Sequence, residues 1–251
     1  MPRPPAPDNE RVAMAKYWTK SWNVLYGCTK CRAGCTHCWA EVMARRLQAN
    51  GVLDGVVDDK GNWTGNIVYK PERLLMPYSW KTPQIVAVNW MSDTFHANVP
   101  SEVWPALCEV MRDTPRHIYL VLTKRYEKMA EQIRHQLANV YFGVTISNQK
   151  DADEAREPLA ECSRYGGKTW VSHEPALEVV DWSRYRYISG LVCGGESGTG
   201  AREMPEAAAI SAKEFCLIHE IPFTFKQWGG KHGQGNMLNG TSWHGFPALD
   251  K

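Results

Sequence analysis

Four cysteines lie within one eleven-residue segment of the chain, at Cys28, Cys31, Cys35 and Cys38. Thiolates at such short spacings let a single loop wrap around an iron–sulfur cluster. Two Cys-x2-Cys pairs can instead hold a tetrahedral zinc ion, but the pairs of such sites are typically joined by a longer connection than the three residues between Cys31 and Cys35. The spacing therefore favours an iron–sulfur cluster, and structural zinc stays open as the alternative.

Polar and charged residues follow several short apolar runs of the sequence. The carboxylate of Asp93, beside Ser92, could pair with an ammonium group, and Lys124 could pair with a carboxylate or a phosphate. Further candidate cofactor contacts of this kind are Thr145, Ser147, Gly194, Gly195 and Glu196. Glu174 and Lys226 are candidate catalytic residues that contact a substrate. Each of these residues could instead be an ordinary helix cap or turn residue.

These residues need secondary-structure elements that bring them together. Short apolar, β-branched or aromatic runs alternate with helix-like segments along the chain. We expect strands at 23–26, 85–90, 117–122, 140–144, 169–172, 191–193 and 222–225. We expect helices at 40–49, 101–112, 127–136, 149–162 and 206–219. The alternation predicts an α/β fold in which about six or seven parallel strands form a partial (β/α) barrel with right-handed crossovers.

A barrel of this kind collects the loops that follow its strands at one end, which is the active face. The candidate residues above follow expected strands, so we expect them at a common site. Tryptophans beside them in the sequence could stack on an adenine or a nucleobase, or could pack in the core; they are Trp22, Trp39, Trp90 and Trp228.

Composition and the ends of the chain bound the domain organisation. We expect one barrel domain at 16–251, with an insertion at about 51–83 that is rich in Gly, Asp and Asn, after a disordered Pro-rich tail at 1–15. The net charge of +2 does not by itself indicate a nucleic-acid-binding protein. No apolar run approaches the ~20 residues that span a membrane, and the first residues lack the apolar stretch of a secretory signal. We therefore expect a cytoplasmic protein that does not bind membranes.

Seven segments of the sequence, in order, resemble the motifs of a phage-encoded family of proteins of unknown function that is related to radical-SAM enzymes. The segments are WNVLYGCTKCRAGCTHCWAE, VNWMSDTFH, LVLTKR, FGVTISNQ, VSHEP, CGGESGTGAREM and PFTFKQWGG. The resemblance runs from about Trp22 to Phe246. It implies a barrel of the radical-SAM type, an external electron donor, and a location in the cytoplasm of the infected host cell.

In radical-SAM enzymes, three cysteines hold a 4Fe–4S cluster whose fourth iron is chelated by S-adenosylmethionine (SAM). Electron transfer then cleaves SAM to a 5′-deoxyadenosyl radical, so the cofactor supplies the difficult chemistry. The resembled family has the pattern Cys-x6-Cys-x2-Cys, which implies Cys28, Cys35 and Cys38 as ligands. The general radical-SAM spacing, Cys-x3-Cys-x2-Cys, begins at Cys31 instead. The first ligand therefore stays open between Cys28 and Cys31.

The resemblance also implies a nucleotide-type substrate, such as a hypermodified thymine in phage DNA, altered by an isomerase or a transferase. A second hypothesis is a nucleic-acid-binding protein with a structural zinc or iron–sulfur site that is saturated by four cysteines. A third is an iron–sulfur repair nuclease or glycosylase that does not use SAM. The near-neutral net charge disfavours the second and third hypotheses.

Overall fold

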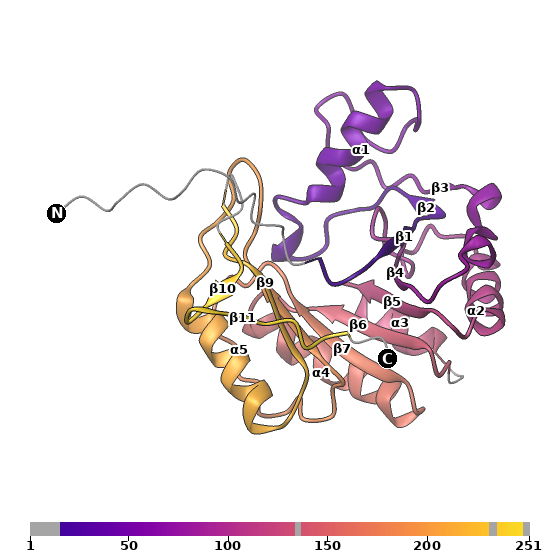
Figure 1. Cartoon of the computed structure of the whole chain (residues 1–251). Helices are drawn as coiled ribbons and strands as arrows, with labels where there is room; N and C mark the ends of the chain where they lie inside the picture. The colour runs from indigo at the N-terminus through magenta and orange to yellow at the C-terminus, as the bar shows by residue number, and fades with distance from the viewer. Residues whose placement is uncertain (1–15, 134–136, 231–234, 248–251) are drawn as a thin grey trace.

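The computed structural model describes residues 16–133, 137–230 and 235–247, so the expected disordered tail at 1–15 lies outside the described residues. Seven parallel strands form a curled sheet with the shape of a half-barrel (Figure 1). In spatial order they are β1 (Lys20–Trp22), β4 (Ile85–Val88), β5 (Ile118–Thr123), β6 (Val140–Thr145), β7 (Lys168–His173), β8 (Leu191–Gly194) and β9 (Phe223–Gln227). The prediction of an α/β fold with a partial barrel of six or seven parallel strands is confirmed.

Helices connect the barrel strands and cover the outer face of the sheet (Figure 1). They are α2 (Val103–Asp113), α3 (Tyr126–Gln132), α4 (Gln149–Arg164) and α5 (Glu206–Ile218). The helix expected at 127–136 ends at Gln132, and its last three expected positions, 134–136, lie outside the described residues.

Side chains alternate between the two faces of the sheet, as they must in extended strands. On β5, Tyr119 joins the main core between sheet and helices, whereas its neighbour Leu120 belongs to a second cluster inside the half-barrel. Trp170 on β7 also belongs to this inner cluster, and so do Tyr17 and Phe246 from segments outside the sheet. The interior is therefore filled partly by the barrel strands and partly by the segments before and after them.

The first barrel strand lies earlier than the predicted 23–26. The chain leaves the sheet after β1 because the side-chain oxygen of Asn89 accepts hydrogen bonds from the backbone N–H groups of Val24 (2.9 Å) and Leu25 (3.2 Å). The next residues form β2 (Leu25–Tyr26), which pairs with β3 (Val68–Tyr69) in an antiparallel ribbon. The predicted segment thus contains a strand, but one that lies outside the barrel.

The expected insertion at 51–83 contains β3 and two 3-10 turns, Pro71–Arg73 and Met76–Ser79. Its first part packs on α1 (Trp39–Ala49) in a small core of its own, around Ala44, Leu53 and Val56. Figure 1 shows α1 above the half-barrel. This unit therefore lies directly after the segment that carries the four cysteines.

The other edge of the sheet is covered by the C-terminal segment. A hairpin of β10 (Met237–Leu238) and β11 (Thr241–Ser242) precedes it. The N–H of Gly245 then donates to the carbonyl of Phe223 at 2.8 Å, and the N–H of Phe225 donates to the carbonyl of Trp243 at 3.0 Å. These bonds occupy backbone groups of β9 that would otherwise lie at an open edge.

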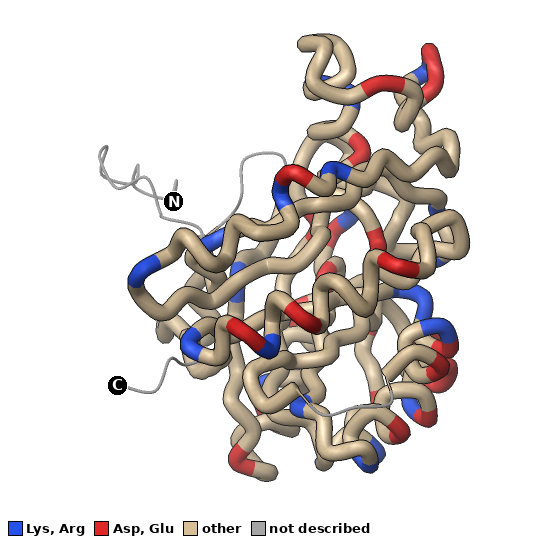
Figure 2. The backbone as a smooth tube through the Cα atoms, turned by 90° about the vertical axis from the view of Figure 1, so that its right-hand side faces the viewer, with Lys and Arg blue, Asp and Glu red and all other residues tan. Residues whose placement is uncertain are grey.

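Charged residues of both signs are interspersed along the backbone (Figure 2), in keeping with the small net charge of +2. In the part of the chain that the structure describes, no helix is both long enough and apolar enough to cross a membrane.

Candidate functional site

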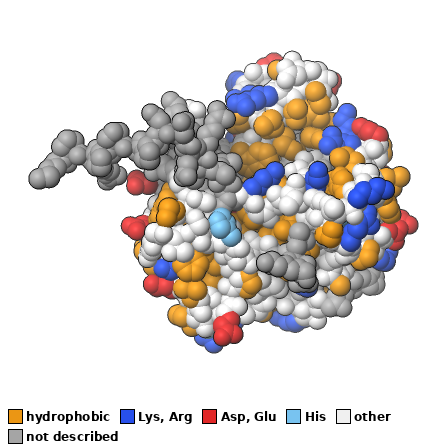
Figure 3. Space-filling model, in the orientation of Figure 1, with side chains coloured by type: hydrophobic (Ala, Val, Ile, Leu, Met, Phe, Trp, Pro, Cys, Tyr) orange, Lys and Arg blue, Asp and Glu red, His pale blue; other side chains and the backbone are white. Residues whose placement is uncertain are grey.

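One cavity opens at the carboxyl ends of the barrel strands, with about 1100 Å³ of empty volume when the open solvent at its mouth is included. On the face seen in Figure 3, hydrophobic side chains gather in a hollow beneath α1, with Lys and Arg side chains at its border. Three of the four cysteines line the cavity: Cys28, Cys35 and Cys38. The other predicted residues in its wall are Ser92, Asp93, Lys124, Thr145, Glu174, Gly195, Glu196 and Lys226. The half-barrel thus brings most of the candidate residues to one site.

Three predicted residues lie outside the cavity wall. Cys31 lines a second, more open hollow beside the cysteine segment. Ser147 is fully buried behind the segment, and a Cβ atom on Gly34 would lie only 2.4 Å from its Oγ. Gly194 lies beneath Glu174, whose Oε1 would be 3.2 Å from a Cβ at that position. Ser147 and Gly194 therefore shape the site through packing.

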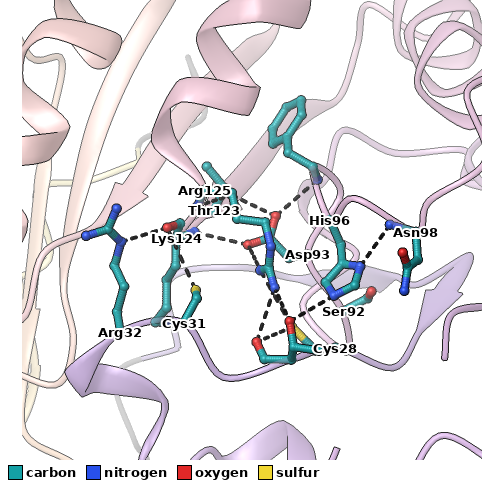
Figure 4. A network of polar contacts seen from close by, with 12 residues as sticks. Cys28, Cys31, Arg32, Ser92, Asp93, His96, Asn98, Thr123, Lys124 and Arg125 are labelled. Carbon is teal, nitrogen blue, oxygen red and sulfur yellow. Dashed lines mark hydrogen bonds and ion pairs between the residues drawn. The ribbon is translucent and has the colours of Figure 1, made fainter. Parts of the chain in front are cut away.

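The segment 27–38, which we call the cysteine loop, is held at its start by Arg125 and Asp93 (Figure 4). Arg125 donates from Nη1 to Oδ2 of Asp93 at 2.9 Å and from Nη2 to the carbonyl and the hydroxyl of Thr29, and its Nη1 lies 3.7 Å from Sγ of Cys28. Ser92 donates from Oγ to the carbonyl of Gly27 at 2.6 Å. The loops after β4 and β5 therefore fix the position of Cys28.

Asp93 has no acceptor capacity left for a ligand. Its Oδ1 accepts hydrogen bonds from the Thr123 hydroxyl (2.7 Å) and the Phe95 N–H (3.0 Å). Its Oδ2 accepts from the Lys124 N–H (3.1 Å) and from Arg125. A buried carboxylate with four donors is a structural anchor, so Asp93 acts on the cysteine loop through Arg125.

Arg32 holds the middle of the cysteine loop. Its Nε donates to the carbonyl of Lys124 at 2.8 Å, and its guanidinium lies 3.8 Å from the ring centre of Tyr126. It also forms ion pairs with Asp151, at 3.4 Å, and with Glu154 on α4. Because the planar guanidinium contacts both an aromatic ring and carboxylates, the Arg32 side chain is held in one orientation.

Glu196 holds the end of the cysteine loop. Its Oε2 accepts hydrogen bonds from Nδ1 of His37 at 2.8 Å and from the backbone N–H of Arg202 at 2.9 Å, and the Arg202 guanidinium donates to both carboxylate oxygens. Arg202 also donates to the carbonyl of Ala33 at 3.0 Å. Burial would raise the pKa of Glu196, but the hydrogen bonds from Arg202 and His37 outweigh it and lower the pKa to about 2.

The thiols have the chemistry that an iron–sulfur cluster needs, because thiolate sulfur is its usual ligand. Burial is the main cause that raises the pKa of Cys28 to about 11, whereas a hydrogen bond with the neighbouring Cys31 thiol lowers the pKa of Cys35. Among the described residues, no three His, Cys, Asp or Glu side chains stand close enough together to hold a metal ion. Binding of a cluster would therefore require the loop to draw its thiols closer together.

Lys124 supplies positive charge beside the thiols. Burial opposes the charge of its ammonium group, but the surrounding Cys35, Cys38, Asp93 and Cys31 outweigh burial and raise its pKa. Its Nζ makes no hydrogen bond with any residue that the structure describes. Lys124 therefore keeps donors for a ligand in the cavity.

Glu174 and Lys226 form an ion pair of 2.6 Å deeper in the wall. The second oxygen of Glu174 accepts hydrogen bonds from the hydroxyls of Tyr17 (2.8 Å) and Ser172 (3.2 Å). Two other polar atoms of cavity residues are buried and lack a partner among the described residues, Oγ1 of Thr145 and Oε1 of Gln227. Since buried polar groups are nearly always hydrogen-bonded, these two atoms are suited to a bound ligand.

The tryptophans divide between the site and the core. Trp39 and Trp90 line the cavity, and so does Trp63, which sequence reasoning did not select. Trp22 is fully buried against Tyr119, with its ring centre 5.7 Å away, and Trp228 packs on Phe225. Of the two predicted alternatives, Trp39 and Trp90 therefore lie at the site, and Trp22 and Trp228 pack against other aromatic residues.

Sequence reasoning also missed Tyr17, Arg32, His37 and Arg202. His37 and Arg32 could have been noted as the polar members of the cysteine loop. Tyr17 lies before the first strand and Arg202 follows Glu196 by six residues, so no local pattern connects either with the site.

Comparison with known proteins adds a family but no function. A family model described as "Protein of unknown function (DUF5131)" matches residues 13–247. Neither the curated proteins nor the solved structures contain a match to this chain. The family match covers the half-barrel and the whole of the candidate site.

Proposed function

We propose that this chain, which belongs to the DUF5131 family of proteins of unknown function, is a radical-SAM enzyme that acts on a nucleotide-type substrate. One observation carries the proposal. Cys28, Cys35 and Cys38 come from one clamped loop and line the same cavity as polar residues from six strand ends, whereas Cys31 lines the neighbouring hollow. This arrangement offers three thiolates to a cluster and leaves cavity volume beside them.

Cys28, Cys35 and Cys38 would hold a 4Fe–4S cluster in this proposal. When bound, the cluster together with SAM supplies a 5′-deoxyadenosyl radical that can abstract a hydrogen atom from a substrate. The position of Cys31 outside the cavity wall favours Cys28 as the first ligand, in agreement with the resembled Cys-x6-Cys-x2-Cys pattern. The clamps from Arg125, Arg32 and Glu196 hold the loop in place for this task.

Lys124 is the proposed partner of the SAM carboxylate, because its ammonium group lies in the cavity wall with free donors. Thr145 and Gln227 offer buried, unpartnered oxygens to the remaining polar groups of the cofactor or substrate. Asp93 and Glu196 are proposed as positioning residues, since protein donors already occupy both carboxylates.

A nucleotide-type substrate agrees with the aromatic cavity wall. Trp39, Trp63 and Trp90 offer flat faces on which a base can stack. Glu174 and Lys226 are proposed to contact the substrate from the charged part of the wall. The resemblance adds a phage origin and a hypermodified thymine in DNA as the candidate substrate, altered by an isomerase or a transferase.

The proposal is tested by anaerobic purification and reconstitution with iron and sulfide. After addition of dithionite and SAM, we expect 5′-deoxyadenosine, measured by liquid chromatography and mass spectrometry. The matched control is Cys35→Ala, which removes a proposed cluster ligand and is expected to yield none. A brown protein that forms no 5′-deoxyadenosine contradicts the proposal and favours a structural cluster held by all four cysteines. A colourless protein with one zinc ion favours the nucleic-acid-binding alternative.

A further inference from the structure

Tyr17 is a cavity residue for which cofactor binding provides no role. It comes from the segment before β1, is buried, and lines the same cavity as Cys28, Cys35 and Cys38. Its hydroxyl donates a hydrogen bond of 2.8 Å to Oε2 of Glu174. Burial and the nearby Glu174 raise the pKa of Tyr17 well above its usual value, so the phenol keeps its hydrogen.

The hydrogen bond to Glu174 can be released without leaving that carboxylate unpartnered. Lys226 lies 2.6 Å from its Oε1, and the Ser172 hydroxyl donates to its Oε2 at 3.2 Å. The phenol can therefore turn its O–H bond toward the cavity while Glu174 remains neutralised. A phenol O–H bond is weaker than the C–H and N–H bonds of other side chains, which makes it the natural hydrogen-atom donor in this wall once the thiols hold a cluster.

Tyr17 also belongs to a cluster of aromatic rings. Its ring centre lies 5.1 Å from Trp18, 5.8 Å from Trp90 and 6.0 Å from Trp170, and Trp18 and Trp90 are 4.7 Å apart. Trp18 is partly exposed, so the cluster connects the cavity with the surface. Closely spaced aromatic rings offer a short path for an electron to reach the phenol.

From this geometry we infer that Tyr17 is a redox-active residue that donates a hydrogen atom to a carbon-centred radical in the cavity. The inference rests on the proposed function. In the step, the phenol O–H bond breaks homolytically, a C–H bond forms on the radical, and a neutral phenoxyl radical remains. One electron from the external electron donor, delivered through Trp18 and Trp90, and one proton from solvent restore the phenol.

The test is freeze-quench EPR spectroscopy of the reconstituted protein without substrate, reduced by one equivalent of dithionite and mixed with SAM. With no substrate present, the adenosyl radical has Tyr17 as its hydrogen source. We expect 5′-deoxyadenosine together with a tyrosyl radical, whose hyperfine lines narrow when the tyrosines carry ring deuterium. Tyr17→Phe is expected to lose the tyrosyl signal, and the 5′-deoxyadenosine that it still forms takes its hydrogen atom from the buffer instead.

Tyr119→Phe is the matched control, because Tyr119 is buried in the outer core and its hydroxyl bonds with Thr114. It is expected to keep the signal. Formation of 5′-deoxyadenosine without a tyrosyl signal in the parent protein overturns the role of Tyr17 and leaves the proposed function standing, even if Tyr17→Phe does not fold. A signal that persists in Tyr17→Phe also overturns it. Absence of 5′-deoxyadenosine overturns both proposals.

Discussion

The carboxylate of Glu196 accepts a hydrogen bond of 2.8 Å from Nδ1 of His37, a residue that lies between Cys35 and Cys38. This bond joins the loop after β8 to the cysteine loop, across the cavity mouth. With the contact from Arg202 to Ala33, it makes Glu196 part of the support of the cysteines. A Gly-Gly-Glu sequence that suggests a ligand contact thus has its carboxylate directed at the protein itself.

Glu196→Gln is expected to weaken the hold on the cysteine loop. Glutamine keeps the size of the side chain but loses the charge that makes each of these hydrogen bonds worth about 1.5–3 kcal/mol. We predict faster loss of iron to a chelator, measured anaerobically by absorbance. Glu157→Gln is the control, because Glu157 pairs with Arg164 on the exposed face of α4. Unchanged iron loss with weaker SAM binding would show that Glu196 contacts the cofactor instead.

Asp93→Asn is expected to destabilise the fold even without a cluster. The NH2 group of asparagine would face protein groups that now donate hydrogen bonds to Asp93. Arg125 would also lose its buried carboxylate partner. We predict a loss of about 3 kcal/mol in the free energy of unfolding, from urea titration of the cluster-free protein. The exposed Asp58→Asn serves as the control. A cluster-free protein of unchanged stability that binds SAM poorly would speak for a direct ligand role.

Gly34→Ala is expected to push the cysteine loop away from the barrel. The added Cβ would lie 2.4 Å from Oγ of Ser147, which is buried and cannot move freely. Overpacking of this kind typically costs about 1–3 kcal/mol. We predict a lower thermal midpoint and lower iron content for Gly34→Ala.

Ser147→Ala removes the clashing oxygen, so the double variant Gly34→Ala/Ser147→Ala is expected to recover both quantities. A double variant with the same thermal midpoint and iron content as Gly34→Ala alone would show that the contact between these two residues does not determine the position of the cysteine loop.

The half-barrel and the gathering of the site could be predicted from the sequence, because apolar runs mark the strands and parallel strands end at a common edge. The roles of Asp93 and Glu196 could not be predicted in this way. Their partners, Arg125 and Arg202, become neighbours only through the tertiary fold, and a free carboxylate looks the same in a sequence as one with every lone pair occupied. The first barrel strand lies earlier than predicted because the hydrogen bonds that Asn89 accepts from the N–H groups of Val24 and Leu25 are likewise long-range.

The stability of the protein is expected to depend on pH through His173. Burial is the main cause that lowers its pKa to about 4, whereas a histidine in an unfolded chain has a pKa of about 6.5. Between these values the unfolded chain binds more protons, so the free energy of unfolding falls as pH drops from 6.5 toward 4, by about 3 kcal/mol in total.

Urea titrations of the cluster-free protein at pH 7 and pH 4.5 measure this effect. His173→Gln lacks the histidine, whereas the carboxylates that titrate in this range are common to both proteins. The free energy of unfolding of His173→Gln is therefore expected to fall less than that of the parent protein. An equal decline in the two proteins would exclude His173 as its source.

The most direct test of the account is the metal content of two single variants, reconstituted anaerobically with iron and sulfide. Cys28 lines the cavity, whereas Cys31 lines the neighbouring hollow instead. We predict about four iron and four sulfide per chain in the parent protein and in Cys31→Ala, and a large loss of both in Cys28→Ala. Retention in Cys28→Ala with loss in Cys31→Ala, or zinc in place of iron in the parent protein, would contradict the account.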